Sequence, residues 1–304
     1  MEAFLGLKID VCTYEGLRLG VPNLLRLLDQ HGIQGTFFVA LGPDTSGRAI
    51  FHALRPGFLA KMRRTSAVRT YGLRTILSGT LLPPRQMGQL KSTLREIVAA
   101  GHELAIHGYD HRQWQDRLHR MKKQAVREEI DRAEAIYRET TGNAPRGFGA
   151  PGWQVSTASL EVLDEVGFGY ASDTRGRQPF FPRVGGRRLQ TLQLPTTFPT
   201  LDEVLGPEDP AGQNFIGQVR REIHSRVWSV LTVHAEMEGI GYLAVADGLF
   251  SVLGKDGVTC LSLETVGEKV RAREGGPIPV TEIVARPIRG RAGTVAMPVG
   301  LEVE

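Results

Sequence analysis

The sequence predicts an α/β fold in which about seven strands close into a (β/α) barrel. Short apolar runs alternate with amphipathic helical runs along all 304 residues, and no repeat or linker divides the chain. This alternation implies a mostly parallel sheet. Ionisable side chains follow several of the expected strands. A closed barrel gathers these strand ends at one face, whereas an open sheet spreads them along an edge, so the barrel is favoured.

The expected strands are short apolar or alternating runs with many β-branched and aromatic residues. In chain order they cover residues 4–9, 36–40, 103–106, 146–150, 168–172, 189–194 and 228–233. The helices between them carry recognisable end signals. They are expected over residues 21–32, 86–100, 121–140, 156–166 and 212–225, with Pro22 near the start of the first, Ser156 as an N-cap, and Gly32, Gly101, Gly142 and Gly167 at the ends.

Composition limits the class of protein. With 41% hydrophobic and 23% charged residues the chain is ordinarily globular. The two cysteines, Cys12 and Cys260, are too far apart to form a metal knuckle, and they indicate a reducing compartment. The first residues do not form a signal peptide, and no uncharged run reaches the roughly 18 residues of a membrane span. We therefore expect a cytoplasmic protein.

The basic charge is concentrated in one segment. The net charge is +4, and no acidic residue occurs between Asp44 and Glu96. No nucleic-acid-binding motif accompanies this segment, so no nucleic-acid partner is expected. Apolar residues recur at roughly helical spacing within it, at Phe51, Leu54, Phe58, Leu59 and Met62. This pattern fits either a core helix with a solvated basic face or a helix lying in a membrane interface.

Two histidines suggest a metal site. His107 and His111 follow the alternating run 103–106, and their spacing of four predicts that both lie on one side of a helical turn. Imidazoles so placed can bind one metal ion, but a catalytic site needs a third ligand and a water.

Asp10 and Cys12 follow the first strand. Residues two apart in an extended segment share a face, so both are expected to point into the mouth that holds the histidines. The alternative is that Cys12 is a small buried apolar residue and Asp10 a turn former. His234 ends the last apolar strand, where it is either a structural histidine or a catalyst. Glu236, two residues on, is close enough to orient it.

Two histidines on a metal, a carboxylate base and a separate histidine suit the hydrolysis of an amide. At this point the residues carry a resemblance. The chain resembles the NodB-type carbohydrate deacetylases and, more closely, the 4-deoxy-4-formamido-L-arabinose-phosphoundecaprenol deformylases. The similar segments span nearly the whole chain and include residues 7–11, 56–62, 107–114, 170–176, 194–206 and 233–239.

The resemblance implies a fold and a set of roles. The fold would be the distorted seven-stranded (β/α) barrel of the carbohydrate-deacetylase type. Asp10 would be the general base, His234 the general acid, and His107 and His111 two ligands of one divalent metal ion. The expected substrate-binding residues are Trp153, Asp173 and Arg175, which match the sugar pocket, together with Glu236.

One departure from the family pattern bears on the metal. Where the family has a second aspartate as third ligand, this chain has Cys12. A thiolate favours zinc over hard ions, with manganese, cobalt or nickel as alternatives. Otherwise Cys12 is a bystander and water or Glu236 completes the shell, or the site binds metal weakly and is inactive. A second departure lies near the fourth strand. The broader deacetylases have an arginine there, whereas this chain has Gly-Ala-Pro-Gly at 149–152, and the deformylases share this departure.

The resemblance also implies a substrate and a location. We expect removal of a formyl or acetyl group from an amino sugar carried on a polyprenyl phosphate, by a protein on the inner face of the cytoplasmic membrane that binds its anionic surface. The alternatives are a weakened protein that only binds lipid-linked sugar and a deacetylase of another amino sugar. Residues 1–304 are expected to form one domain, with a basic amphipathic insertion at about 45–85 and a C-terminal extension at about 275–304.

Overall fold

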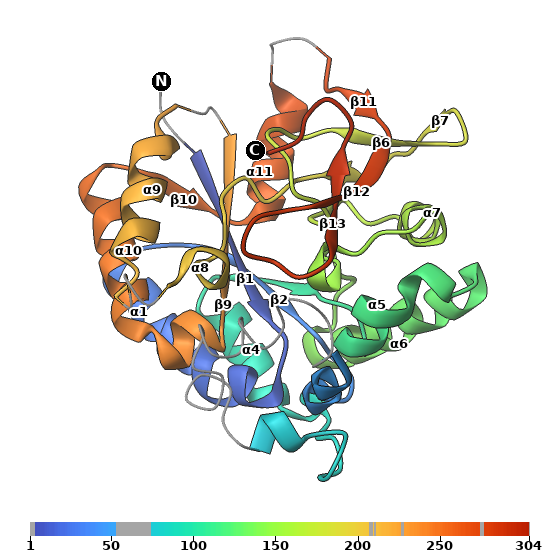
Figure 1. Cartoon of the computed structure of the whole chain (residues 1–304), viewed down its shortest axis with the longest axis horizontal. Coiled ribbons are helices and arrows are strands. Elements are labelled where there is room, and N and C mark those ends of the chain that lie inside the picture. Colours follow the sequence, from blue (N-terminus) through green and yellow to red (C-terminus); the bar gives the residue numbers. More distant parts are fainter. Residues whose placement is uncertain are drawn as a thin grey trace.

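The computed structural model describes residues 4–52, 74–206, 209, 211–225, 228–273 and 277–303. Its centre is a parallel sheet (Figure 1). β1 pairs with β9 on one side and with β2 on the other, and the sheet continues through β3, β4 and β5 to β8. The bounds of these strands are β1 Phe4–Val11, β2 Thr36–Val39, β3 Glu103–Ile106, β4 Gly147–Phe148, β5 Tyr170–Ala171, β8 Leu192–Gln193 and β9 Trp228–His234.

All seven expected strands are therefore present, and the distorted barrel is confirmed. An eighth strand, β10 (Thr259–Leu261), pairs with the first residues of β1 and was not expected. Within the described residues no ladder joins β8 to β9. Single contacts span this seam instead: Thr197 N donates to Val230 O at 2.9 Å, and the hydroxyls of Thr196 and Thr232 lie 2.8 Å apart.

Helices cover the outside of the sheet (Figure 1). The helix expected at 86–100 begins as a short 3-10 turn, and α5, α8, α10 and α11 were not expected. The α-helices are α1 Val21–His31, α4 Lys91–Ala99, α5 His111–Arg117, α6 Lys123–Thr141, α7 Thr157–Val166, α8 Leu201–Val204, α9 Gln213–Ile223, α10 Leu243–Lys255 and α11 Leu263–Ala272; the 3-10 or π turns are η1 Gly16–Gly20, η2 Ser46–His52, η3 Met87–Gln89, η4 Leu118–Arg120, η5 Pro151–Trp153 and η6 Met237–Gly241.

Alternate residues of each strand face opposite sides, and both sides are buried. In β1, Leu5, Leu7 and Ile9 belong to the large apolar cluster that also contains the buried faces of α1 and α10. The barrel interior has its own cluster, which includes Phe38 and Tyr170 and into which α11 packs Leu263. Even-numbered positions of β1 therefore face the interior, and this places polar side chains at its open end.

The C-terminal residues fold back over that end. Within the expected C-terminal extension, β11 (Val280–Thr281) pairs with β6 (Phe181–Val184) of the β6–β7 hairpin, and β12 (Ile283–Pro287) follows it. The strand β7 is Arg187–Arg188. β12 forms an antiparallel hairpin with β13 (Thr294–Pro298). Val295 and Met297 of β13 pack on Trp153. The C-terminal hairpin thus becomes a wall of the barrel mouth.

Two sequence expectations concern the membrane. The helical pattern proposed around Phe51 to Met62 falls almost wholly at residues outside the described ranges. Among the helices that are described, none is both long and apolar enough to span a bilayer.

Candidate metal centre and active site

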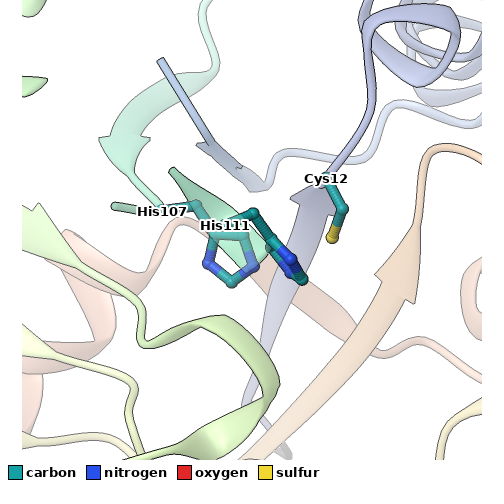
Figure 2. A group of neighbouring side chains, drawn as sticks. All are labelled: Cys12, His107 and His111. Carbon is teal, nitrogen blue, oxygen red and sulfur yellow. The ribbon is translucent and has the colours of Figure 1, made fainter. Parts of the chain in front are cut away.

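Three side chains converge at the mouth of the barrel. Ligand atoms of Cys12, His107 and His111 all lie within 4.8 Å of one another. Figure 2 shows the three side chains pointing toward a common space. Cys12 directly follows β1, His107 directly follows β3, and His111 is the first residue of α5.

The two histidines do not lie on one helical turn, so that expectation was wrong. His107 ends a strand, and Gly108 then reverses the chain with φ +77°, a conformation that favours glycine. The helix starts only at His111, because the Asp110 carboxylate caps it by accepting hydrogen bonds from the amides of Arg112 and Gln113, both at 3.0 Å. The rings of His107 and His111 still approach to 5.1 Å between centroids.

The protonation states suit metal binding. His107 Nδ1 lies 2.7 Å from Gly149 O, and donation of this proton leaves Nε2 free to act as a ligand. Burial lowers the pKa of both histidines well below the ordinary value, so both are neutral at pH 7. For Cys12, burial raises the pKa well above the ordinary thiol value, and the negative charges of Glu236 and Asp10 raise it further. The thiolate therefore needs a cation beside it.

The donor set fits one divalent ion of moderate softness. Two imidazole nitrogens and one sulfur leave a fourth position of a tetrahedron open, as catalytic zinc requires. Because their ligand atoms lie within 4.8 Å of one another, Cys12, His107 and His111 are the residues that would hold such an ion.

Asp10 lies beside this set, with Oδ2 at 4.0 Å from His107 Nε2. It is paired with Lys8, whose ammonium lies 3.7 Å from Asp10 Oδ1 and donates to Ser172 O at 2.8 Å. Lys8 is fully buried, and burial lowers its pKa while Asp10 and Asp173 oppose that change. Lys8 thus holds a positive charge behind Asp10 inside the barrel.

His234 lies directly across the β1–β9 ladder from Asp10. Its ring meets Trp153 edge-on, with 6.5 Å between centroids. Its amide donates to Glu238 Oε2 at 2.8 Å. The expected base and acid are therefore neighbours on adjacent strands at the same mouth.

Glu236 does not reach into the open mouth. Its Oε1 accepts hydrogen bonds from Cys12 N at 2.9 Å, Thr13 N at 2.7 Å and Thr13 Oγ1 at 2.9 Å. Burial raises the pKa of Glu236 to about 7. The carboxylate thus shapes the loop that carries Cys12, and it is Glu238 that bonds His234.

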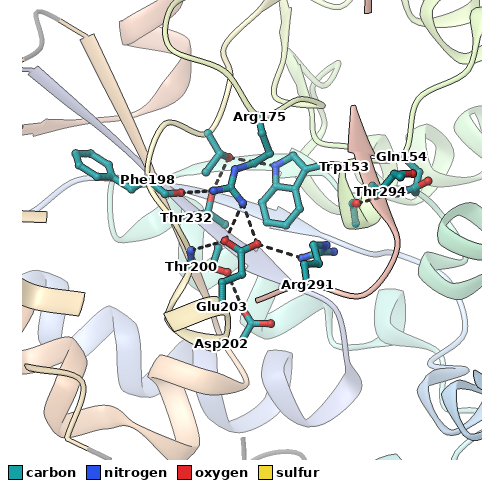
Figure 3. A network of polar contacts seen from close by, with 12 residues as sticks. Trp153, Gln154, Arg175, Phe198, Thr200, Asp202, Glu203, Thr232, Arg291 and Thr294 are labelled. Atoms are coloured by element: carbon teal, nitrogen blue, oxygen red, sulfur yellow. Dashed lines mark hydrogen bonds and ion pairs between the residues drawn. The ribbon is translucent and has the colours of Figure 1, made fainter. Parts of the chain in front are cut away.

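Trp153 and Arg175 form part of a polar cluster at the edge of the mouth (Figure 3). Trp153 has φ 53°, rare for a residue with a side chain, and is only 2% exposed. Arg175 donates to both oxygens of Glu203, at 2.9 and 3.0 Å, and to Phe198 O at 2.7 Å. Arg291, from the turn between β12 and β13, also faces the Trp153 ring.

Asp173 is buried inside the barrel. It accepts hydrogen bonds from Ala150 N at 2.8 Å and Gln193 Nε2 at 3.0 Å. Burial raises its pKa to about 6. Both oxygens are committed to protein donors, so Asp173 fixes the end of β4 in this structure.

Three residues of this site were missed in the sequence: Lys8, Glu238 and Arg291. For Lys8 a signal was present, because a lysine at an even position of an otherwise apolar strand shares the face of Asp10 and Cys12. For Glu238 and Arg291 the partners are fixed only by the fold.

Comparison with known proteins identifies the family of this chain. The polysaccharide deacetylase family model matches residues 6–171. A protein of Shewanella sediminis named probable 4-deoxy-4-formamido-L-arabinose-phosphoundecaprenol deformylase is 38% identical over 77% of this chain and 76% of its own length. A protein of the same name from Wigglesworthia glossinidia brevipalpis is 30% identical over 92% of this chain and 97% of its own.

The fold has a counterpart of known structure. The crystal structure of a protein from Mycobacterium smegmatis described as a polysaccharide deacetylase superposes with a TM-score of 0.62 at 20% identity, covering 94% of each chain. This likeness concerns the fold alone.

Proposed function

Because this chain belongs to the polysaccharide deacetylase family, whose members hydrolyse amide bonds, we propose that it removes a formyl group from an amino sugar carried on a polyprenyl phosphate. The observation that carries the proposal is the meeting of Cys12, His107 and His111 with Asp10 and His234 at one barrel mouth. The formyl group and the lipid carrier are taken from the names of the two deformylases, and an acetyl group is the alternative.

Each residue has a role that its position supports. A bound divalent ion supplies polarisation of the acyl oxygen and a water of lowered pKa. Asp10, beside the ligand set and backed by Lys8, takes the proton from the attacking water. His234, across the ladder from Asp10, gives a proton to the departing nitrogen. Sugar contact at Trp153 and Arg175 is part of the proposal. Asp173 and Glu236 support the pocket instead, through the hydrogen bonds that they accept from neighbouring protein groups.

Zinc is the metal we propose, with Cys12 as the third ligand. A sulfur donor disfavours Mg²⁺ and other hard ions. The alternative in which Glu236 completes the shell is weakened by the three hydrogen bonds that its Oε1 accepts from Cys12 and Thr13.

The ligand assignment is tested with cobalt. Wild type loaded with Co²⁺ should show thiolate-to-metal charge transfer in the near ultraviolet, and Cys12→Ser should abolish it and lower zinc occupancy. Cys260→Ser is the matched control, because Cys260 is the other free and partly exposed cysteine. A band that survives Cys12→Ser and vanishes in Cys260→Ser would refute the assignment, and so would unchanged zinc occupancy in Cys12→Ser.

We also propose that the basic segment at about 45–85 binds an anionic membrane beside the active site. Its described ends meet where Gly47 N donates to Ser78 O at 2.9 Å. Thr45 Oγ1 donates at 2.9 Å to Asp110, the cap of the helix that begins with His111. The described ends of the segment therefore lie close to the helix that begins with His111.

Vesicle binding tests the membrane contact. The full chain should sediment with vesicles containing phosphatidylglycerol and not with neutral phosphatidylcholine, and Arg63→Gln with Arg64→Gln should weaken binding. Arg127→Gln, on the exposed face of α6, is the matched control. Equal sedimentation with both kinds of vesicle would contradict the proposal.

Formate release tests the reaction itself. The zinc-loaded chain should release formate from a 4-formamido-arabinose joined through phosphate to a short prenyl chain, and Asp10→Asn should remove this activity while the lipid-linked sugar still binds. A protein that only binds lipid-linked sugar would bind it and release nothing. A deacetylase of another substrate would release acetate instead.

A further inference from the structure

The turn between β12 and β13 presents one arginine to the active site. Arg291 lies with its guanidinium carbon 4.6 Å from the centroid of Trp153, whose ring in turn meets His234. Arg291 is therefore one aromatic ring away from the expected general acid. Figure 3 shows it beside the ion pair of Arg175 and Glu203.

The turn is held in place by packing. Ile288 at its start and Val295 at its end belong to the cluster around Trp153. Gly290 has φ +81°, and a Cβ there would lie 2.1 Å from the carbonyl oxygen of Glu203. Only glycine allows this close approach. These contacts hold the backbone that carries Arg291 in place.

Among the described residues, three cations face the Trp153 ring, and two of them are already committed to protein acceptors. Lys8 donates to Ser172 and is paired with Asp10. Arg175 donates to both carboxylate oxygens of Glu203. Arg291 has only a loose ion pair, 3.7 Å to Glu203 Oε1, and its guanidinium donates no hydrogen bond to any residue within the described ranges. Its side chain remains 11% exposed.

Charge near this arginine favours an anion. The Glu203 charge is already offset by the two-pronged contact with Arg175, so the donors of Arg291 are not needed to neutralise it. The other carboxylate of the cluster, Asp202, accepts a hydrogen bond from Thr200. A planar guanidinium with free donors matches two oxygens of a phosphate.

In the proposed substrate the phosphate lies across the sugar ring from the formamide. In a 4-formamido-4-deoxy-arabinose, carbon 4 bears nitrogen, so the ring closes through the oxygen on carbon 5 and has six members. Carbon 1, which carries the phosphate, is then opposite carbon 4. When the formamide is at the metal ligands, the phosphate lies one sugar ring away.

We propose that Arg291 binds the phosphodiester of the lipid-linked sugar and so selects a glycosyl phosphate over a neutral glycoside. This inference rests on the proposed function. It makes the C-terminal hairpin, which lies outside the residues matched by the family model, a specificity element of the active site.

A matched pair of substrates tests it. Both contain the same 4-formamido sugar, one joined through phosphate to a short prenyl chain and the other as a neutral prenyl glycoside. In the zinc-loaded chain, Arg291→Gln should raise KM for the phosphodiester about 10- to 100-fold with kcat retained, and should leave KM for the neutral glycoside unchanged. Arg291→Lys should recover part of the loss. Arg289→Gln, an exposed arginine on the same turn, should match wild type with both substrates.

The possible outcomes separate this inference from the proposed reaction. If Arg291→Gln impairs both substrates equally, or if wild type does not prefer the phosphodiester, the phosphate role is refuted. If wild type releases formate from neither, the proposed reaction fails, and calorimetric titration with arabinose 1-phosphate then decides the inference alone. Binding to wild type that is lost in Arg291→Gln supports it, and equal or absent binding overturns it.

Discussion

Lys8 offers a direct measure of how the barrel interior holds its charges. Its ammonium lies 3.7 Å from Asp10 Oδ1, an oxygen that accepts no hydrogen bond from the described residues. With an effective dielectric constant of about 20, this pair attracts by about 4–5 kcal/mol. Lys8→Met keeps the volume and removes the charge, so Asp10 stays buried without its counter-charge. We expect the free energy of unfolding to fall by about 3–5 kcal/mol.

Guanidinium chloride unfolding followed by circular dichroism measures this loss. Lys91→Met is the matched control, because Lys91 pairs with Glu139 at the surface, where such a pair contributes about 1 kcal/mol or less. In an Asp10→Asn background the cost of Lys8→Met should fall markedly, because the uncompensated charge is gone. A cost of Lys8→Met no larger than that of Lys91→Met would refute the reasoning, as would the same cost in both backgrounds.

Two further predictions concern the helix cap at the metal site and the other end of the barrel. Asp110→Ala should lower the free energy of unfolding by about 1 kcal/mol and weaken zinc binding in a metal titration. Ser156→Ala, which removes a comparable cap far from the ligands, should lower the free energy of unfolding by a similar amount and leave zinc affinity unchanged. Equal zinc affinities of the two variants would contradict this prediction. Burial raises the pKa of Glu103 from 4.5 to about 7 in the folded protein although Tyr170 donates to it at 2.7 Å. The folded state therefore holds this proton more tightly, so the stability that Glu103 contributes is greatest below pH 4.5 and falls as pH rises to about 7, by on the order of 3 kcal/mol. Glu103→Gln should make the free energy of unfolding depend less on pH across that range. An unchanged pH dependence would exclude Glu103 as its cause.

Much of the fold could be predicted because apolar runs mark the long strands of the central sheet. The 230–233 run and the 36–39 run are buried on both faces, and such runs leave a continuous apolar signal. The strand β10 gave no such signal, because it has three half-buried residues and pairs with only the first part of β1. The helix α10 is apolar around most of its surface and contains Gly248 and Gly254, so neither its period nor its ends could be recognised.

The structure brings the expected site residues together, but the local geometry of the two histidines differs from the predicted one. The spacing of His107 and His111 suggested a helical turn, but the preceding strand extends to the first histidine and Gly108 then turns the chain. The approach of Asp10 and His234 to these histidines was easier to predict, since the ends of the strands gather at one mouth of a barrel. The roles of Arg175 and Glu236 depend on Glu203 and Thr13, which are distant in sequence and come together only through the fold. No local pattern encodes such pairs.

The pairing of β1 with β9 has a consequence for the order in which the protein is synthesised. Asp10 and His234 face each other across this ladder, although one is near the start of the chain and the other comes after most of it has been made. All three proposed metal ligands, in contrast, precede residue 112. During translation the proposed ligands are therefore made before the proposed acid and the C-terminal hairpin, so the side chains of the candidate metal set are present on the chain before the residues proposed to complete the active site.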